Sequence, residues 1–395
     1  MSFAFRVLVI LINAFLANNI VFGQEYPQPA PDQYEIDKTL DENRINPQTA
    51  EFADAAEKLR DHLKLMRAIF VRFSVNDDPT KDADFLADFN ELINSGFALH
   101  RDMTSAALAE YKQGTSEKKK IADMLARLVK RETEADRYEG IAEIADVLAT
   151  DGYPEPDMRR QVVTIGLATN RHDLVRKHID QLITETGDEA TFVPIRDSLS
   201  DLEALWHEEI EYQKQDAAGE PLPRVVLNTT KGAIELELFE NQAPETVANF
   251  INLIERGFYD GKSFHRVVEH FAAQGGCPYG DGTGDDGYWI YGERHKPNAR
   301  NFFRGTIGMA LAGTNVDSGG TQFFITFFPA TELNASFTAF GRVVRGIEVL
   351  GNLTKVDPEA KEKEKDEPAQ PVDEIISAKV ISKRDHAYEP NKIPR

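Results

Sequence analysis

Apolar residues in the first half of the chain recur at steps of three and four positions, which is the spacing of one face of an α-helix. The clearest stripes are Phe52, Ala55, Ala56, Leu59, Leu63, Met66 and Phe70, then Phe85, Phe89, Leu92 and Ile93, then Ile121, Leu125, Leu128 and Val129. Similar segments cover residues 141–148, 158–182 and 192–212, and Gly152 and Pro154 mark a break. The pattern predicts an antiparallel α-helical domain over residues 46–215, whose stripes form a core rather than a cofactor site.

The pattern changes after residues 216–223, a stretch with Ala, Gly and Pro that is typical of a linker. Ile234, Leu236 and Leu238 then alternate with glutamates, which predicts a strand with one buried face. Further strands are expected at residues 264–268, 306–310, 322–327, 339–343 and 375–381, with helices from Pro244 and at 347–353. Many short strands with two helices suit a closed antiparallel barrel, because closure leaves no exposed sheet edge.

The N-terminus reads as a targeting segment. Arg6 precedes an apolar run at residues 7–17, and small residues suited to cleavage follow near Gly23. The run is shorter than the roughly 20 apolar residues that span a bilayer. The sequence therefore predicts a signal peptide at 1–23, a Pro-rich linker at 24–45, and an exported protein, periplasmic or extracellular, with no stable membrane anchor.

Composition is that of a soluble globular protein, with 41% hydrophobic and 28% charged residues among 395. The net charge of −21 argues against nucleic acid as a partner, because phosphate binding needs clustered Lys and Arg. We interpret the acidity as a solubility feature, with a preference for basic client proteins as the alternative. Cys277 is the one cysteine in the sequence, which excludes an internal disulfide and argues against a metal site.

Three short segments of the β region carry the most specific motifs. Residues 263–276 contain Ser-Phe-His-Arg-Val-Val, then Phe271, then Gln-Gly-Gly; residues 308–313 read Gly-Met-Ala-Leu-Ala-Gly, and residues 321–326 read Thr-Gln-Phe-Phe-Ile-Thr. Together they supply one guanidinium, two glutamine amides and several large apolar rings, but no nucleophile–base pair and no set of metal ligands. That inventory suits a reaction that only twists a bond.

The order and spacing of these motifs resemble the cyclophilin-type peptidyl-prolyl cis-trans isomerases, from about Arg224 to about Lys383. The resemblance implies an eight-stranded closed antiparallel β-barrel with two capping helices over residues 224–383, followed by a tail at 384–395. It also implies an isomerase (rotamase) that acts on X-Pro bonds of proline-containing polypeptides without a cofactor.

By this resemblance Arg266 is the catalytic arginine, whose donors suit the lone pair that the proline nitrogen regains when the amide twists. A surface ion pair is the alternative interpretation of Arg266. Phe271 and Gln274 complete the predicted catalytic set. The predicted substrate-binding residues are His265, Ala272, Ala310, Leu311, Ala312, Gln322, Phe324, Glu332, Leu333 and Phe337.

The resemblance also implies the role of each group of residues in substrate binding. Phe271, Phe324 and Leu333 line the site for the proline ring, and residues 310–312 pair with the peptide. The two glutamines hold the catalytic arginine or the substrate backbone. We interpret His265 as a buried or rim histidine, not as a general base.

Four positions depart from the family's common pattern. Glu332 stands where many members have Trp and Phe337 where many have His, while Leu311 and Ala272 replace a frequent Asn and Met. These changes put peptide preference and the family's ciclosporin binding in doubt. Three functions therefore stay open. The first is an isomerase that assists the folding of exported proteins, with a helical domain that binds clients or a partner protein. The second is a low-turnover chaperone or scaffold module with the cyclophilin fold. The third is a helical interaction protein whose barrel has no function of its own, which truncation would distinguish.

Overall fold

The computed structural model describes residues 45–74, 82–153, 157–357 and 372–394. The predicted signal peptide at 1–23 and, except for Ile45, the predicted linker at 24–45 lie outside the described residues. The chain divides into two compact units, Met1–Arg131 with Glu143–Met158 and Glu132–Ala142 with Arg159–Arg395. Because compactness does not show which part folds alone, the predicted domain boundaries stay predictions. Within the described residues, no helix combines the length and apolar character needed to cross a membrane.

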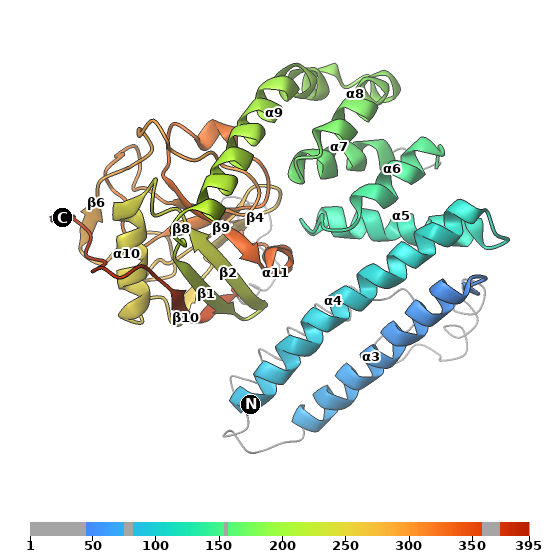
Figure 1. The fold of residues 1–395 in the computed structure, drawn as a ribbon, viewed down its shortest axis with the longest axis horizontal. Helices are drawn as coiled ribbons and strands as arrows, with labels where there is room; N and C mark the ends of the chain where they lie inside the picture. The colour runs from blue at the N-terminus through green and yellow to red at the C-terminus, as the bar shows by residue number, and fades with distance from the viewer. Residues whose placement is uncertain (1–44, 75–81, 154–156, 358–371, 395) are drawn as a thin grey trace, which may run out of the picture. The chain divides into compact units, whose positions relative to one another are not determined.

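The first unit is helical, as its apolar stripes predict. α3 (Ala50–Ser74) and α4 (Asp82–Gln113) lie side by side, and α5 (Lys118–Glu134) and α6 (Ala142–Thr150) follow in the chain (Figure 1). Phe52, Leu59 and Met66 of the first stripe are buried. Thr49 precedes α3, and its amide N and its hydroxyl donate to the Glu110 carboxylate at 2.9 and 3.0 Å. A residue of α4 thus satisfies donors at the start of α3.

Three more helices, α7 (Met158–Ala168), α8 (His172–Thr186) and α9 (Glu189–Ala218), follow. The predicted helical segment at 158–182 is split in two, because Asn170 adopts a φ of 55° between α7 and α8. Asp188 caps α9 by accepting a hydrogen bond from the Thr191 amide at 3.2 Å. α9 continues through Ala218, so residues 216–218 of the predicted linker are helical.

Nine strands of the second unit form one antiparallel sheet in the order β3-β10-β1-β2-β9-β7-β8-β5-β4. They are β1 (Arg224–Thr229), β2 (Gly232–Leu238), β3 (Lys262–Ser263), β4 (Arg266–Val268), β5 (Ala272–Gly275), β7 (Thr306–Met309), β8 (Phe323–Thr326), β9 (Ala339–Arg345) and β10 (Glu374–Ser382). β6 (Tyr288–Ile290) pairs separately with β11 (Lys392–Pro394), which lies in the predicted tail at 384–395. The antiparallel β architecture is confirmed, whereas this topology does not confirm the predicted closed, eight-stranded barrel with two capping helices.

The interior of the sheet follows the predicted alternation. Ile234, Leu236 and Leu238 of β2 are fully buried. α10 (Pro244–Glu255) begins with proline at its first position, as predicted, and packs on β10 and β6, while α11 (Ile347–Asn352) packs on β2. Phe250 of α10 meets Phe340 of β9 edge-to-face, with ring centroids 5.2 Å apart. The sheet and α10 therefore share one hydrophobic core.

Candidate active site

One row of residues crosses four strands of the sheet. Arg266 of β4 is opposite Gln274 of β5, Gln274 is opposite Phe324 of β8, and Phe324 is opposite Gly308 of β7. Residues directly opposite each other in antiparallel strands project to the same face. The register therefore brings the guanidinium, the amide and the aromatic ring of the predicted site onto one face, although up to 58 positions separate them in the numbering of the chain.

An apolar cluster surrounds this row. Its buried members are Ala272, Phe302, Phe324, Ala330 and Ala339, and its partly buried members are Phe271, Ala310, Leu333 and Phe337. Phe337 meets Phe324 edge-to-face, with ring centroids 5.4 Å apart. The structure thus brings together six of the eight apolar residues that the resemblance assigns to the site, and Leu311 and Ala312 are the two outside the cluster. The partly buried members give the cluster an accessible apolar surface.

Two residues that sequence reasoning did not place in the site shape this surface. Phe302 is fully buried and stacks on Phe324, with ring centroids 5.5 Å apart and an interplanar angle of 22°. A Cβ at Gly308 would lie 2.5 Å from the Phe324 ring and 2.6 Å from the Phe302 ring, so only glycine leaves room for the stacked pair. The sequence offers no sign of this role for Phe302, because a lone aromatic residue in a loop is as well explained by the general core.

The Arg266 side chain is half-buried and lies over the Phe271 ring, with its guanidinium carbon 5.6 Å from the ring centroid. Among the described residues the structure gives Arg266 no carboxylate partner within ion-pair distance, so the surface ion pair considered from the sequence is not found there. A guanidinium without a fixed anion keeps donors available for a ligand.

The two glutamines of the predicted site contact each other. Gln274 Nε2 donates to Gln322 Oε1 at 3.1 Å. Gln322 Nε2 in turn donates to the carbonyl oxygens of Gly282 and Gly284, both at 2.9 Å. Gln322 therefore ties the loop that follows β5 to the edge of the site, and it holds Gln274 from one side.

His265 is buried, with 8% exposure, beside Gly282. Burial lowers the pKa of His265 from its ordinary value, so its ring is neutral at neutral pH. Its Nδ1 has no hydrogen-bond partner among the described atoms. Burial agrees with the interpretation of His265 as a buried histidine.

The remaining predicted residues lie at the border of the cluster. The Ala310 amide donates to the Gln322 carbonyl at 3.0 Å, and the Ala312 amide donates to Ser318 Oγ at 2.7 Å. Leu311 is partly exposed, and Ala312 and Glu332 are exposed. Glu332 lies in a 3-10 turn at Thr331–Leu333, directly before the leucine that packs on the cluster.

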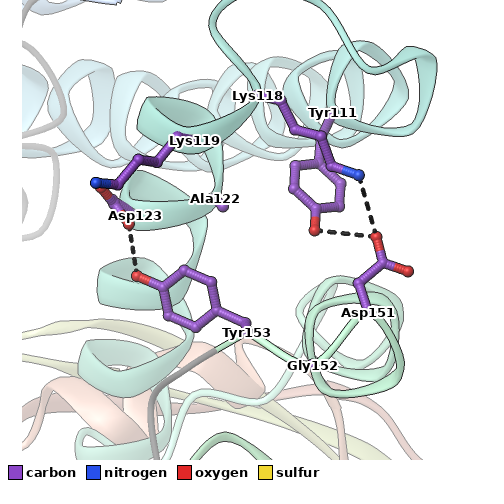
Figure 2. Close-up of a pocket in the computed structure, with 8 residues that line it drawn as sticks. All are labelled: Tyr111, Lys118, Lys119, Ala122, Asp123, Asp151, Gly152 and Tyr153. Atoms are coloured by element: carbon purple, nitrogen blue, oxygen red, sulfur yellow. Dashed lines mark hydrogen bonds and ion pairs between the residues drawn. The ribbon is translucent and has the colours of Figure 1, made fainter.

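The first unit contains a separate cavity of about 620 Å³, lined by Tyr111, Lys118, Lys119, Ala122, Asp123, Asp151, Gly152 and Tyr153 (Figure 2). Tyr111 donates to Asp151 at 3.0 Å and Tyr153 donates to Asp123 at 2.8 Å. Burial and the hydrogen bond to Asp151 raise the pKa of Tyr111 to about 12. Both tyrosine hydroxyls in this cavity therefore donate to carboxylates.

Comparison with known proteins agrees with the sequence motifs. The family model described as cyclophilin type peptidyl-prolyl cis-trans isomerase/CLD matches residues 224–380. A peptidyl-prolyl cis-trans isomerase of Helicobacter pylori is 46% identical over 134 residues, which cover 33% of this chain and 80% of the relative. Peptidyl-prolyl cis-trans isomerase B of Bacillus subtilis is 48% identical over 124 residues, covering 31% and 85%.

A solved cyclophilin-type peptidyl-prolyl cis-trans isomerase of Cryptosporidium parvum, crystallised in the presence of the dipeptide Ala-Pro, is 30% identical. It covers 40% of this chain and 99% of its own, with a TM-score of 0.36. The matches to the bacterial relatives span 80% and 85% of the length of those proteins, and the range of the family model includes the row from Arg266 to Phe324. The chain therefore belongs to the cyclophilin-type peptidyl-prolyl cis-trans isomerase family, whose domain occupies residues 224–380.

Proposed function

We propose that this protein isomerises X-Pro bonds of exported polypeptides and so assists their folding, with Arg266 stabilising the twisted amide. The observation that carries the proposal is the strand register that aligns Arg266, Gln274 and Phe324 on one face. Uncatalysed X-Pro exchange takes tens to hundreds of seconds, which is slow enough to limit folding. A catalyst of this step therefore has a clear use wherever newly exported chains fold.

The chemistry needs no proton transfer. Rotation about the amide crosses a barrier of about 18–20 kcal/mol, because twisting destroys amide resonance. In the twisted state the proline nitrogen regains a lone pair, and a donor aimed at it binds that state better than either planar isomer. Arg266 suits this role, since its guanidinium is permanently charged and has no carboxylate partner among the described residues. The neutral, buried His265 is not needed as a base.

The substrate is proposed to lie along the row. The proline ring packs on the partly buried Phe271 and Leu333 beside the buried Phe324, where apolar contact replaces water. The peptide backbone is held by Gln274, Gln322 and the segment at 310–312. β3 and β4 lie at opposite ends of the nine-stranded sheet, and only Phe264 and His265 separate them in the chain. We propose that β3 and β4 act as one strand, which closes the sheet into an eight-stranded barrel capped by two helices.

Export is proposed from the segment at 1–23, and a periplasmic or extracellular location follows from it. Fractionation of the native host, with N-terminal sequencing of the mature protein, tests this. An intact Met1 in the cytoplasmic fraction would remove exported proteins from the list of clients.

A protease-coupled assay on a short X-Pro peptide tests the activity itself. The full-length protein should accelerate exchange, and Arg266→Ala should not. The alternative, a low-turnover chaperone or scaffold module, predicts that the unmodified protein binds the peptide without accelerating exchange. Peptide binding measured by calorimetry on the same samples separates the two functions.

The helical first unit is proposed to bind clients or a partner protein. Its cavity is the place to test, because Lys119 lines it together with Tyr111 and Tyr153 and has no carboxylate within ion-pair distance among the described residues. Lys119→Ala and Tyr153→Ala should weaken suppression of client aggregation while leaving isomerisation of a short peptide unchanged. Aggregation suppression that survives both changes would place the client surface elsewhere.

A further inference from the structure

The turn between β4 and β5 has an unusual backbone at His270. This residue adopts a φ of 55°, in the left-handed region that glycine favours and few other residues enter. Phe271 follows directly and lies under the Arg266 guanidinium. The Phe271 amide donates to the Val268 carbonyl at 3.2 Å, which closes the turn. The position of a ring in the proposed proline site therefore depends on a residue in a strained conformation.

A carboxylate from elsewhere in the second unit holds this turn. Asp136 lies in the segment Glu132–Ala142, and its side chain is fully buried. Its two carboxylate oxygens accept from the His270 amide at 3.1 and 3.2 Å, and Oδ1 lies 2.7 Å from His270 Nδ1. The Tyr138 hydroxyl donates to the same Oδ1 at 2.9 Å. Both the backbone and the ring of His270 are thus fixed by one side chain.

The same carboxylate also contacts a lysine beside the segment that pairs with β4. Lys355 Nζ donates to Asp136 Oδ2 at 2.8 Å. Lys355 precedes Val356, whose backbone exchanges hydrogen bonds with Val267 of β4 at 2.7 and 2.9 Å. β4 is a three-residue strand at the end of the sheet, and it carries Arg266. Asp136 therefore connects the two segments that flank this short strand.

Electrostatics favour the ionised carboxylate at this point. Burial alone would raise the pKa of Asp136, but the hydrogen bond from His270 and the charge of Lys355 outweigh it and bring the pKa to about 2. The groups that face His270 are Asp136, the Tyr138 hydroxyl, Glu269 and Lys355. The hydrogen bond with Asp136 raises the pKa of His270, since the carboxylate stabilises the imidazolium.

We infer that Asp136 is a positioning residue for the isomerase reaction. Through His270 it fixes the turn that carries Phe271, and through Lys355 it fixes the segment paired with the strand that carries Arg266. This inference rests on the proposed function of those two residues. Geometry of this kind matters because a misplacement of about 1 Å at a reacting site can cost about 100-fold in rate.

The test compares Asp136→Asn with the unmodified full-length protein. Asparagine keeps the size of the side chain and an acceptor oxygen but removes the charge. We expect kcat for an X-Pro peptide to fall about 10- to 100-fold, with KM changed by less than about twofold. Glu139→Gln is the matched control, because it removes a carboxylate of the same segment that contacts Arg304 and not the turn. It should leave kcat unchanged.

Amide hydrogen exchange gives a readout that does not depend on catalysis. In Asp136→Asn we expect faster exchange at His270 and Phe271 and in β4, with the rest of the sheet unchanged. An unmodified protein without activity would contradict the proposed function, whereas the exchange result tests the positioning role by itself. Exchange that is unchanged in the turn, or raised evenly through the whole sheet, would overturn the positioning role.

A second variant covers the possibility that Asp136→Asn folds poorly. The His270 side chain is 46% exposed, so His270→Ala removes the ring with little loss of packing. It should lower kcat in the same direction, and the double variant should lose less than the product of the two single effects, because both changes break one contact. Single effects that multiply fully in the double variant would show that Asp136 does not act through His270.

Discussion

The guanidinium of Arg300 donates to both carboxylate oxygens of Glu209, from Nε to Oε2 at 2.8 Å and from Nη2 to Oε1 at 2.6 Å. Its Nη1 donates to Asp216 at 2.9 Å, and the Arg300 side chain is fully buried. The guanidinium carbon lies 4.0 Å from the centroid of the Phe239 ring. Arg300 lies in the loop before β7, and both carboxylates lie on α9. This buried charge cluster therefore joins α9 to the loop that leads into the sheet.

Removing one partner of this cluster should destabilise the second unit strongly. Glu209→Ala leaves a buried guanidinium half-paired, and breaking a buried ion pair typically costs about 3–5 kcal/mol. Glu208→Ala, at the exposed neighbour on α9, should change the free energy of unfolding by less than about 0.5 kcal/mol. Urea unfolding followed by circular dichroism measures both. A Glu209→Ala protein as stable as the control would mean that water reaches and solvates Arg300.

Arg266 should contribute to the rate far more than to peptide binding. Losing a donor aimed at transition-state charge typically costs about 100- to 1,000-fold in kcat, and we expect Arg266→Ala to show such a loss with KM little changed. Arg266→Lys should also fail, because a flexible ammonium does not reproduce the planar fork. Arg345→Ala, with its side chain 79% exposed, is the control. Near-normal kcat in either Arg266 variant would contradict the assigned role.

The sequence predicted those parts of the fold that depend on local pattern. Phe52 and Leu59 are buried where a period of three to four residues puts them, and Ile234 and Leu236 are buried where alternation does. The sequence does not predict β5, because Ala-Ala-Gln-Gly has no alternation and no β-branched residue. It assigns β11 to a tail, since three residues are too few for a pattern.

Contacts between distant parts of the chain could not be predicted in this way. Glu209 and Arg300 are 91 residues apart and Asp136 and His270 are 134 residues apart, and each of these residues by itself reads as ordinary surface. The resemblance supplied most residues of the site because the family motif spans them. It did not supply Phe302, whose stacking on Phe324 depends on the loop before β7.

Gly308→Ala should disturb the proposed proline site directly. The new Cβ would lie within 2.6 Å of both stacked rings, so Phe324 or Phe302 must move. We expect kcat/KM to fall at least tenfold and the free energy of unfolding to drop by about 1–3 kcal/mol, as is typical of overpacking. Gly320→Ala is the matched control, since its Cβ would meet nothing closer than 3.5 Å. An unchanged kcat/KM in Gly308→Ala would show that substrate does not contact these rings.

The contact between Asp136 and His270 should make stability depend on pH. The pKa of His270 is raised above its ordinary 6.5, so its stabilising effect is complete below about pH 6.5 and is lost as pH rises through the raised value. The pKa of Asp136 is lowered from 3.8 to about 2, so its effect is present above about pH 3.8 and is lost as pH falls through about 2. The difference in Tm between the unmodified protein and His270→Ala should therefore be larger at pH 5.5 than at pH 9. A difference that does not change with pH would mean that the pair carries no charge.

The exposed carboxylate of Glu332 should alter what the rim of the site accepts. An apolar macrocycle such as ciclosporin would lose aromatic contact at this position and would pay a desolvation cost if it covered the charge. A peptide with basic residues near proline would instead gain a modest attraction that salt weakens, reinforced by the net charge of −21. Ciclosporin should therefore bind weakly, and Glu332→Trp should strengthen it and flatten the preference for basic peptides.

Calorimetry with ciclosporin, and kcat/KM for paired basic and neutral peptides at low and high salt, measure both effects of Glu332. Glu208→Trp places an indole on the exposed side of α9 and controls for nonspecific binding to a surface aromatic residue. Leu333 follows Glu332 in the sequence, and its side chain packs on the apolar cluster. An indole at position 332 would therefore be attached at the border of the site. Tight ciclosporin binding by the unmodified protein, or a Glu332→Trp variant with unchanged affinity, would show that Glu332 does not lie where the ligand binds.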